Sequence, residues 1–515
     1  MSLACTGRAA LATAVVVPLV VALVRGGGPR AVATRVRLSW LAATAALVAC
    51  GIAVHLRTFG LLAGTRAHPW AGLLGDPLTT VLITLVTTVG ALVQSFASRY
   101  LYADTRAGRF GSLAGAVVFA MVVVASAATV TELVVGWVLA GAGFVAVVGY
   151  RPDLPGVTGC QKATLRALLA GDGCLVAAAG IVLWKAGDVA LGSAGSLGEA
   201  ATRLGAWHPV VALLVAAAAL SRCAQGPFRR WLPATVASPT PACALLHAGV
   251  VNGGGILLVR LGVLGTTPLA AAAVLVVAGT TSVWAGLVVT ARADVKGALA
   301  WSTMGQMGFM LAECAVGAYP AAVVHLVGHA LYKAYLFFSS GSTVSRPDRV
   351  RASLGTRSGA RVLASTLAGS AAAAAAAPGL AAGDGWPLVA FAGVSGGVLA
   401  WAFTGHRPLG RSHRLAWPAL LVLAAALYGA LDATLGGLVA PFAGSAGGVL
   451  GPPWLLAVGG ATVAAALVGR RPGARVRLVD AGGLPASPSR HRHPLAGVDV
   501  AAGLATVLAG ERRAA

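Results

Sequence analysis

The sequence predicts an all-α membrane protein that crosses the bilayer many times, and three observations support this. Of its 515 residues, 57% are hydrophobic and only 10% are charged, whereas about 25% are charged in a typical soluble domain. Apolar runs of about 20 residues, enough to cross about 30 Å of hydrocarbon as a helix, recur along almost the whole chain. Because these runs lack the polar/apolar alternation of membrane β-barrels, the spans are predicted to be helical.

We expect about 15 transmembrane helices, all within a membrane domain formed by residues 1–469. The candidate spans lie near residues 9–24, 38–56, 76–98, 110–129, 132–150, 167–184, 207–225, 241–263, 269–290, 297–315, 321–343, 362–383, 387–405, 416–441 and 453–469. The remaining segment, 470–515, is polar, basic and interrupted by Pro and Gly. It is expected to be a cytoplasmic tail, either poorly ordered or ending in one short amphipathic helix.

The basic residues are distributed unevenly over the connections between the predicted spans. The net charge is +23, and most of the 38 Lys and Arg lie in alternate connections, starting with 25–37 and ending with the tail. This bias assigns those connections to the cytoplasmic side of a bacterial inner membrane. The N-terminus is then outside and the C-terminus is cytoplasmic. Since no aromatic residues are interleaved for base stacking, we expect contact with membrane lipid and not with nucleic acid.

The seven cysteines are scattered through or beside the spans, without a Cys-x-x-Cys or Cys/His cluster. This spacing predicts neither a disulfide framework nor a zinc site. No quinone, flavin or iron–sulfur motif is present either, so we expect no metal, no cofactor and no catalytic residue in this chain.

Residues 221–255 contain charged, proline and glycine residues where an apolar protein would have an uninterrupted helix. Arg222 precedes Pro227, and His247 lies in an otherwise apolar run that Asn252 and the following three glycines interrupt. Broken helices at membrane depth are tolerated where protein or water satisfies the freed backbone groups. Ionisable groups at that depth usually belong to an ion or proton path. For His247, a neutral ring bonded to a backbone carbonyl is the alternative.

Acidic residues also occur within the predicted spans. Glu132 opens one span, where it could simply favour the helix N-terminus, but Arg222 in a later span offers it a buried partner. Asp172, in a Gly-Asp-Gly sequence, and Glu313 are further intramembrane acids. We expect Glu132, Arg222 and Asp172 to belong to the ion path, whose core covers residues about 110–343.

A second group of titratable residues follows, with His325, His329 and Lys333 spaced i, i+4, i+8. On a helix these side chains share one face at intervals of roughly 6 Å, which suits proton transfer through one water between neighbours. A metal site is the weaker alternative, because no nearby carboxylate or cysteine completes a ligand set. A buried lysine can change its protonation state, which an arginine cannot.

Several of these stretches resemble the antiporter-like subunits shared by respiratory complex I and the Mrp cation/proton antiporters. The stretches are Arg222-Cys-Ala-Gln-Gly-Pro-Phe-Arg-Arg-Trp-Leu-Pro233, Pro239-Thr-Pro-Ala-Cys-Ala-Leu-Leu-His247-Ala, Asp294-Val-Lys-Gly-Ala-Leu-Ala-Trp-Ser-Thr-Met-Gly-Gln-Met-Gly308, and the His325/His329/Lys333 spacing. The resemblance covers roughly residues 95–343. It implies an antiporter-like bundle, in which Glu132 and Arg222 match the family's Glu–Lys pair. His247, Lys296, His325, His329 and Lys333 match its central proton path.

Within that superfamily, the sequence is most similar to the membrane subunits of the two-component DAB inorganic-carbon uptake systems. Pro227-Phe-Arg-Arg-Trp and His247-Ala-Gly-Val-Val-Asn-Gly-Gly carry this likeness. It implies a soluble, zinc-containing, carbonic-anhydrase-like partner subunit. Two departures are notable: Arg222 replaces the superfamily's lysine, and residues 387–405 lack the expected lysine or glutamate.

The sequence thus predicts the ion-translocating subunit, with the proton as the expected ion, of an energy-coupled carbon dioxide or bicarbonate uptake complex. Two alternatives remain open at this stage. One is a proton-pumping subunit of an NADH-quinone oxidoreductase complex, and the other is a Mrp-type cation/proton antiporter subunit.

Overall fold

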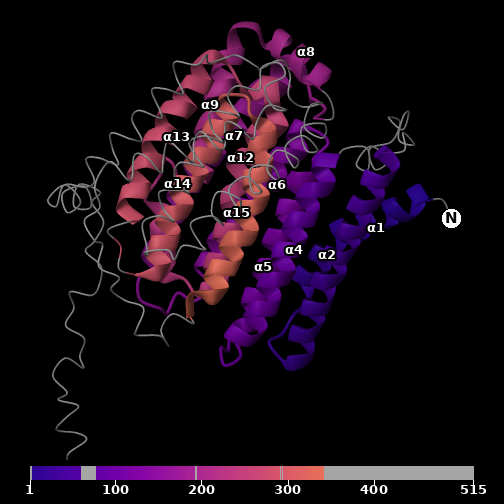
Figure 1. The fold of residues 1–515 in the computed structure, drawn as a ribbon, viewed down its shortest axis with the longest axis vertical. Helices are drawn as coiled ribbons and strands as arrows, with labels where there is room; N and C mark the ends of the chain where they lie inside the picture. The colour runs from indigo at the N-terminus through magenta and orange to yellow at the C-terminus, as the bar shows by residue number, and fades with distance from the viewer. Residues whose placement is uncertain (1–2, 59–76, 192–193, 290–291, 293, 342–515) are drawn as a thin grey trace, which may run out of the picture. The chain divides into compact units, whose positions relative to one another are not determined.

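The computed structural model describes residues 3–58, 77–191, 194–289, 292 and 294–341, and these residues are almost entirely helical (Figure 1). No strand occurs among them; one isolated bridge joins Thr129 and Ala190. The all-α prediction is therefore confirmed for this part of the chain. The last four predicted spans and the predicted tail, 470–515, lie outside the described residues.

Each predicted span within the described ranges coincides with a helix or a pair of helices. The helices are α1 (Leu3–Leu23), α2 (Pro29–Thr58), α4 (Pro77–Tyr100), α5 (Ala107–Ser126), α6 (Val130–Val148), α7 (Val157–Ala186), α8 (Ala194–Leu204), α9 (His208–Arg222), α10 (Trp231–Ala234), α11 (Thr240–Ala248), α12 (Gly253–Leu261), α13 (Pro268–Val289), α14 (Val295–Ala315) and α15 (Tyr319–Ser339). Short 3-10 turns lie between some of them, including η3 (Val250–Asn252) and η4 (Gly262–Gly265).

Within the described residues, 10 helical segments are long and apolar enough to cross a membrane. The protein is accordingly a multi-pass membrane protein, although the predicted count of about 15 is not confirmed. Helix α14 is not among the ten, because its Lys, Ser, Thr, Gln and Glu side chains lower its mean hydropathy. It nevertheless packs against α12, α13 and α15, and its Thr303 and Glu313 side chains are buried.

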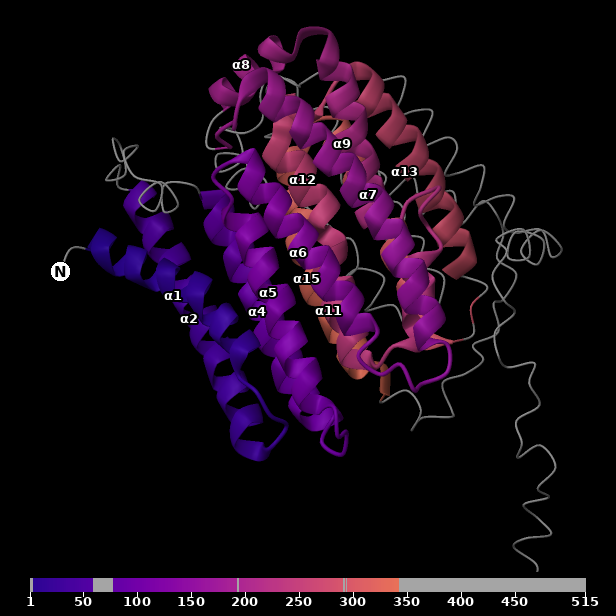
Figure 2. The same ribbon diagram turned by 180° about the vertical axis from the view of Figure 1, so that it is seen from behind.

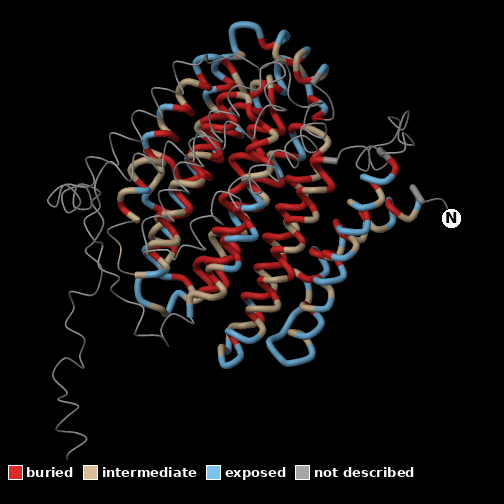
Figure 3. Tube along the Cα trace, viewed as in Figure 1, coloured by how far each residue is buried: buried red, intermediate tan, exposed pale blue. Residues whose placement is uncertain are grey.

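The helices differ sharply in how far they are buried, and the broken segment is the most buried of all (Figure 3). In the most apolar window of the segment Thr240–Gly265, 94% of residues are buried, against 33% and 28% in the first two helices. Helices α1 and α2 pack on each other and against α4 and α5, at one side of the bundle (Figure 2). The polar break therefore lies in the protein interior, where lipid cannot reach it.

The predicted interruption of the helix is confirmed in residues 222–255. Helix α9 ends at Arg222, a loop and the short α10 follow, and the next membrane segment is divided into α11, η3 and α12. Gly254 allows α12 to approach α9 closely, since a Cβ there would lie 2.6 Å from the Ala219 carbonyl oxygen and 2.5 Å from Cys223 Sγ. A side chain at this position would push the two helices apart.

We therefore expect Gly254→Ala to lower the free energy of unfolding by about 1–3 kcal/mol through overpacking. Gly180→Ala in α7 is the matched control, because a Cβ at Gly180 meets no atom within 4 Å. The control should be neutral or stabilised by up to about 1 kcal/mol, the helix-propensity gain of alanine over glycine. Thermal unfolding of both variants in detergent measures the difference, and equal stability would contradict the close packing.

Two loops are joined by ion pairs at one end of the bundle. Arg151, after α6, pairs with Asp104, after α4, at 2.8 Å, and Arg106 pairs with Asp153 at 2.9 Å. Hydrogen bonds from Arg151 hold the pKa of the Asp153 carboxyl below its ordinary value. The connections after α4 and after α6 thus lie at the same end of the bundle. The predicted topology requires this, because every second connection lies on the same side of the membrane.

Candidate functional site

Helices α14 and α15 form an antiparallel hairpin whose facing side chains make three polar contacts. Each contact joins an oxygen of α14 to a nitrogen of one of the titratable side chains on α15. The contacts are Glu313 Oε2 to His325 Nδ1 at 3.0 Å, Gln306 Oε1 to His329 Nδ1 at 2.8 Å, and Ser302 Oγ to Lys333 Nζ at 2.9 Å. We call this set the α14–α15 ladder.

The side chain of Lys333 is fully buried at one end of the ladder. Its ammonium donates to Ser302 Oγ at 2.9 Å and to the Leu299 carbonyl at 3.4 Å, and it has no acidic partner among the described residues. A buried amine held only by neutral oxygens has little to stabilise its positive charge. Lys333 is therefore a buried amine that no ion pair among the described residues neutralises.

His247 lies against the ladder from α11. Its carbonyl oxygen lies 3.1 Å from His329 Nε2, and its ring stacks on Phe337 with centroids 4.6 Å apart. The ring is completely buried, and neither of its nitrogens has a hydrogen-bond partner in the described part of the chain. The alternative reading of His247 as a ring bonded to a backbone carbonyl is thus wrong, because its backbone, not its ring, makes that contact.

Lys296 occupies the first turn of α14, at the same end of the hairpin as Lys333. Its ammonium donates to the Ser238 carbonyl at 3.2 Å, in the turn just before α11. Asp294 caps the helix by accepting from the Gly297 amide at 2.7 Å, and pairs with Arg292. The lysine therefore connects the start of α14 to the start of the broken segment.

Arg222 pairs with Asp172 of α7 and not with Glu132. Its Nη2 lies 2.7 Å from Asp172 Oδ1 and 3.1 Å from the Trp137 carbonyl, with the guanidinium 4.2 Å from the Trp137 ring centroid. The Trp137 indole donates to the same carboxylate oxygen at 2.7 Å. Gly141 makes room for the pair, since a Cβ there would lie 2.8 Å from Asp172 Oδ2.

Glu132 is exposed at the start of α6 and makes a local cap. Its carboxylate accepts from the Ala128 amide at 2.8 Å, while Thr129 Oγ1 accepts from the Glu132 amide at 3.3 Å. This reciprocal pattern satisfies amides that a helix N-terminus leaves free. The expected Glu132–Arg222 pair is therefore wrong, because each residue is engaged elsewhere.

Three members of the ladder were not among the predicted site residues: Ser302, Gln306 and Glu313. Their spacing of four and seven places them on one face of α14, a periodicity that is visible in the sequence. What the sequence does not show is that α15 packs on this face in antiparallel register. The structure supplies that register through the three contacts.

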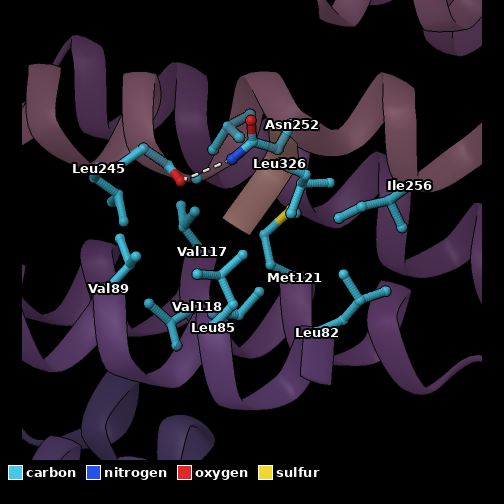
Figure 4. A pocket seen from close by; sticks show the side chains of 14 residues that line it. Leu82, Leu85, Val89, Val117, Val118, Met121, Leu245, Asn252, Ile256 and Leu326 are labelled. Carbon is cyan, nitrogen blue, oxygen red and sulfur yellow. Dashed lines mark hydrogen bonds between the residues drawn. The ribbon is translucent and has the colours of Figure 1, made fainter. Parts of the chain in front are cut away.

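An apolar cavity lies beside the break, between α4, α5, α11, α12 and α15 (Figure 4). The cavity has a water-accessible volume of about 20 Å³, which is enough for about one water molecule. Asn252 supplies its polar edge: the side-chain amide donates to the Ala248 carbonyl at 2.9 Å, and Oδ1 is buried without a partner. The other lining side chains are mainly Leu, Val and Met.

The described residues contain no group of three His, Cys, Asp or Glu side chains that could hold a metal ion. His325 and His329 are neighbours, with ring centroids 6.2 Å apart, but their Nδ1 atoms contact different oxygens. The arrangement is that of three separate contacts between α14 and α15 and not of a shared ligand set.

This fold and this set of buried polar groups agree with the family comparison. Residues 127–390 match the family described as "NADH:quinone oxidoreductase/Mrp antiporter, TM". Residues 66–111 match "NADH-Ubiquinone oxidoreductase (complex I), chain 5 N-terminus". The chain therefore belongs to the NADH:quinone oxidoreductase/Mrp antiporter membrane-subunit family.

Individual relatives narrow the comparison. The chain is 42% identical over 183 residues to the "Probable inorganic carbon transporter subunit DabB" of Hydrogenovibrio crunogenus, covering 35% of each chain. It is 32% identical over 329 residues to subunit DabB2 of Halothiobacillus neapolitanus, covering 61% of this chain and 59% of the relative. It is 32% identical over 286 residues to the chloroplastic NAD(P)H-quinone oxidoreductase subunit 5 of Adiantum capillus-veneris, covering 54% and 39%.

The alignments thus span about a third to three fifths of the length of these curated relatives. Among solved structures, the Mrp complex from Dietzia sp. DQ12-45-1b matches with a TM-score of 0.58 and 24% identity, covering 100% of this chain and 60% of that one. This likeness confirms the antiporter-like fold.

Proposed function

We propose that the protein is the proton-translocating membrane subunit of an energy-coupled inorganic-carbon uptake complex. The α14–α15 ladder is the observation that carries this proposal. Three titratable side chains lie on one face of α15, with His329 and Lys333 buried and His325 half-buried, and each contacts an oxygen of α14. Such groups are costly in a bilayer and are typical of ion paths.

The path uses the residues that change protonation most easily. His325, His329 and Lys333 hold protons along α15. His247, in the broken segment, lies against the ladder, and Lys296 lies at the end of the path near the start of α14. Water molecules bridge the gaps between side chains, as buried water does for groups without protein partners. The chain itself performs transport and no chemical conversion.

Asp172 and Arg222 contribute electrostatically. Since arginine stays protonated, Arg222 does not pass a proton itself. The pair acts as a fixed dipole that adds a constant electrostatic field to the interior of the bundle. A carboxylate held by both Arg222 and Trp137 is well suited to this part, because its position is fixed by two donors.

The partner is proposed to be a soluble, zinc-containing, carbonic-anhydrase-like subunit, which carries out carbon dioxide hydration. Relatives named as inorganic carbon transporter subunits support this assignment. The location is the bacterial inner membrane, with the N-terminus outside and the basic C-terminal segment in the cytoplasm, as the distribution of Lys and Arg predicts.

The first experiment is purification of the tagged chain from its native membrane in mild detergent, followed by mass spectrometry and zinc analysis. We expect one large soluble subunit with zinc to co-purify. Co-purification of quinone, flavin and iron–sulfur subunits would contradict the proposal and assign the chain to a respiratory pump.

A quinone-oxidoreductase subunit is the second candidate, because the similarity to the chloroplastic subunit 5 spans a longer segment than that to the Hydrogenovibrio relative. Sodium- or potassium-dependent proton exchange by the purified complex in vesicles would favour the third candidate, a Mrp-type antiporter subunit.

A further inference from the structure

Glu313 is a buried acidic residue, and the family match gives it no role in ion transport. It lies near the end of α14, and only 3% of its side chain is exposed. Its one described polar contact is with His325, whose Nδ1 lies 3.0 Å from Oε2. A buried carboxylate is stable only if it is paired or protonated, so the state of Glu313 depends on the state of this ring.

The Glu313 contact differs in kind from the other two contacts of the ladder. Gln306 and Ser302 can accept a hydrogen bond from His329 and Lys333, but neither side chain takes up a proton at neutral pH. A carboxylate does take up a proton. Within the ladder, Glu313 is therefore the α14 side chain that can exchange a proton with its partner on α15.

The position of this contact is also distinctive. Helix α14 ends at Ala315 and α15 begins at Tyr319, so the Glu313–His325 contact lies beside the turn of the hairpin. Lys333 lies at the other end. The side chain of His325 is 17% exposed, whereas His329 is 4% and Lys333 is 0% exposed. Among the titratable side chains of α15, the one that contacts the carboxylate is thus the most exposed, while the carboxylate itself is buried.

We propose that Glu313 and His325 form a proton-exchange pair that terminates the path at the turn end of the α14–α15 hairpin. The proton on Nδ1 of the imidazolium passes to Glu313 Oε2, so that one N–H bond breaks and one O–H bond forms. The charged pair becomes a neutral pair, and the reverse step restores it. At 3.0 Å the step needs no intervening water. This inference rests on the proposed function.

The surroundings of the pair are compatible with such an exchange. On α15 the next titratable group is His329, one turn away, and on α14 the adjacent residue is the buried thiol of Cys314. The ring of Phe309 lies 5.6 Å from the His325 ring and covers one side of it. No described basic side chain forms an ion pair with Glu313 other than His325. The charge of Glu313 is therefore balanced by the His325 ring.

A purely positioning role for Glu313 would have different consequences. A carboxylate can fix the tautomer and orientation of a neighbouring imidazole without ever being protonated. Glutamine keeps the shape and an acceptor oxygen, but it cannot take up a proton. Glu313→Gln therefore separates the two roles, and Glu313→Asp tests whether a shorter carboxylate restores function.

The test measures proton flux into proteoliposomes that contain the purified complex, with a pH-sensitive dye and an imposed membrane potential. We expect Glu313→Gln to reduce the flux at least tenfold, since a positioned acid or base contributes about 100-fold or more to proton transfer. The double variant Glu313→Gln/His325→Gln should be no slower than the slower single variant, because both substitutions disable the same step. Cys314→Ser, at the adjacent position, is the control and should keep most of the flux.

Full flux in folded Glu313→Gln, judged by unchanged elution and thermal unfolding, would overturn the proposal. Infrared difference spectroscopy of the wild-type complex gives a readout that does not depend on transport. In the wild-type spectrum we expect the carbonyl band of a protonated carboxyl group. This band should be absent from Glu313→Gln and should shift in His325→Gln. If the complex moves no protons but shows this band, the proposed function fails and the exchange pair stands. If no such band appears at any pH at which the complex is folded, the exchange pair is wrong.

Discussion

Lys333→Ala is expected to abolish proton flux and carbon uptake while the protein still inserts and assembles. The ammonium is fully buried, and neutral oxygens of Ser302 and Leu299 hold it. Removing it interrupts the path at the end of the ladder, and loss of an essential acid or base lowers a rate by about 100- to 10,000-fold. Because Lys333 has no described acidic partner, the substitution leaves no unpaired charge, and the cavity left by its buried stem should lower the free energy of unfolding by about 2–5 kcal/mol.

Uptake of labelled inorganic carbon by intact cells, and proton flux in vesicles, measure the effect. Lys185→Ala is the matched control: Lys185 lies in the last turn of α7 and packs over Trp184 at 3.7 Å. That variant should retain full activity. Lys333→Arg keeps the positive charge but cannot release the proton, and it should also be inactive. Full uptake in Lys333→Ala would remove the proposed path.

Asp172→Asn is expected to destabilise the protein strongly, by about 3–5 kcal/mol, because it leaves the buried Arg222 guanidinium without its counter-ion. Arg222 is 2% exposed and Asp172 is 9% exposed, so water cannot compensate. The double variant Asp172→Asn/Arg222→Gln should regain much of this loss, since no unpaired charge then remains. Thermal unfolding in detergent measures all three proteins.

Glu132→Gln is the comparison that tests which acid is the partner of Arg222. The exposed Glu132 caps α6 by accepting from the Ala128 amide, and since Gln can accept in the same way, Glu132→Gln should change stability by less than about 1 kcal/mol. A greater destabilisation by Glu132→Gln than by Asp172→Asn would contradict the observed pairing.

The sequence predicted the helices and the break well for identifiable reasons. Apolar runs bounded by basic or glycine-rich connections have few alternatives in a bilayer, since the backbone must satisfy its own hydrogen bonds. The helix is interrupted after His247 as expected, but the break lies at Gly249 and the 3-10 turn Val250–Asn252, and the three glycines that follow open α12. The i, i+4, i+8 spacing of His325, His329 and Lys333 likewise predicted that the three side chains share one helix face.

The partner of Arg222 could not be predicted in the same way. Periodicity assigns a residue to a helix face, but it does not say which other helix packs on that face. Asp172 meets Arg222 because α7 packs on α9, where Gly171 lets the helices approach: a Cβ there would lie 2.5 Å from Ser221 Cβ. The family resemblance pointed to Glu132 instead, and only the three-dimensional arrangement shows that it lies elsewhere.

The α14–α15 ladder has a further consequence, for biogenesis. Its contacts join residues 12, 23 and 31 positions apart, whereas the Asp172–Arg222 contact spans 50 and the contact of Arg260 with Thr79 spans 181. Contacts between residues close in sequence form with the smallest loss of chain entropy. Once this hairpin has entered the membrane, its polar side chains can satisfy one another without waiting for distant helices. This polar hairpin thus brings its own hydrogen-bond partners into the bilayer.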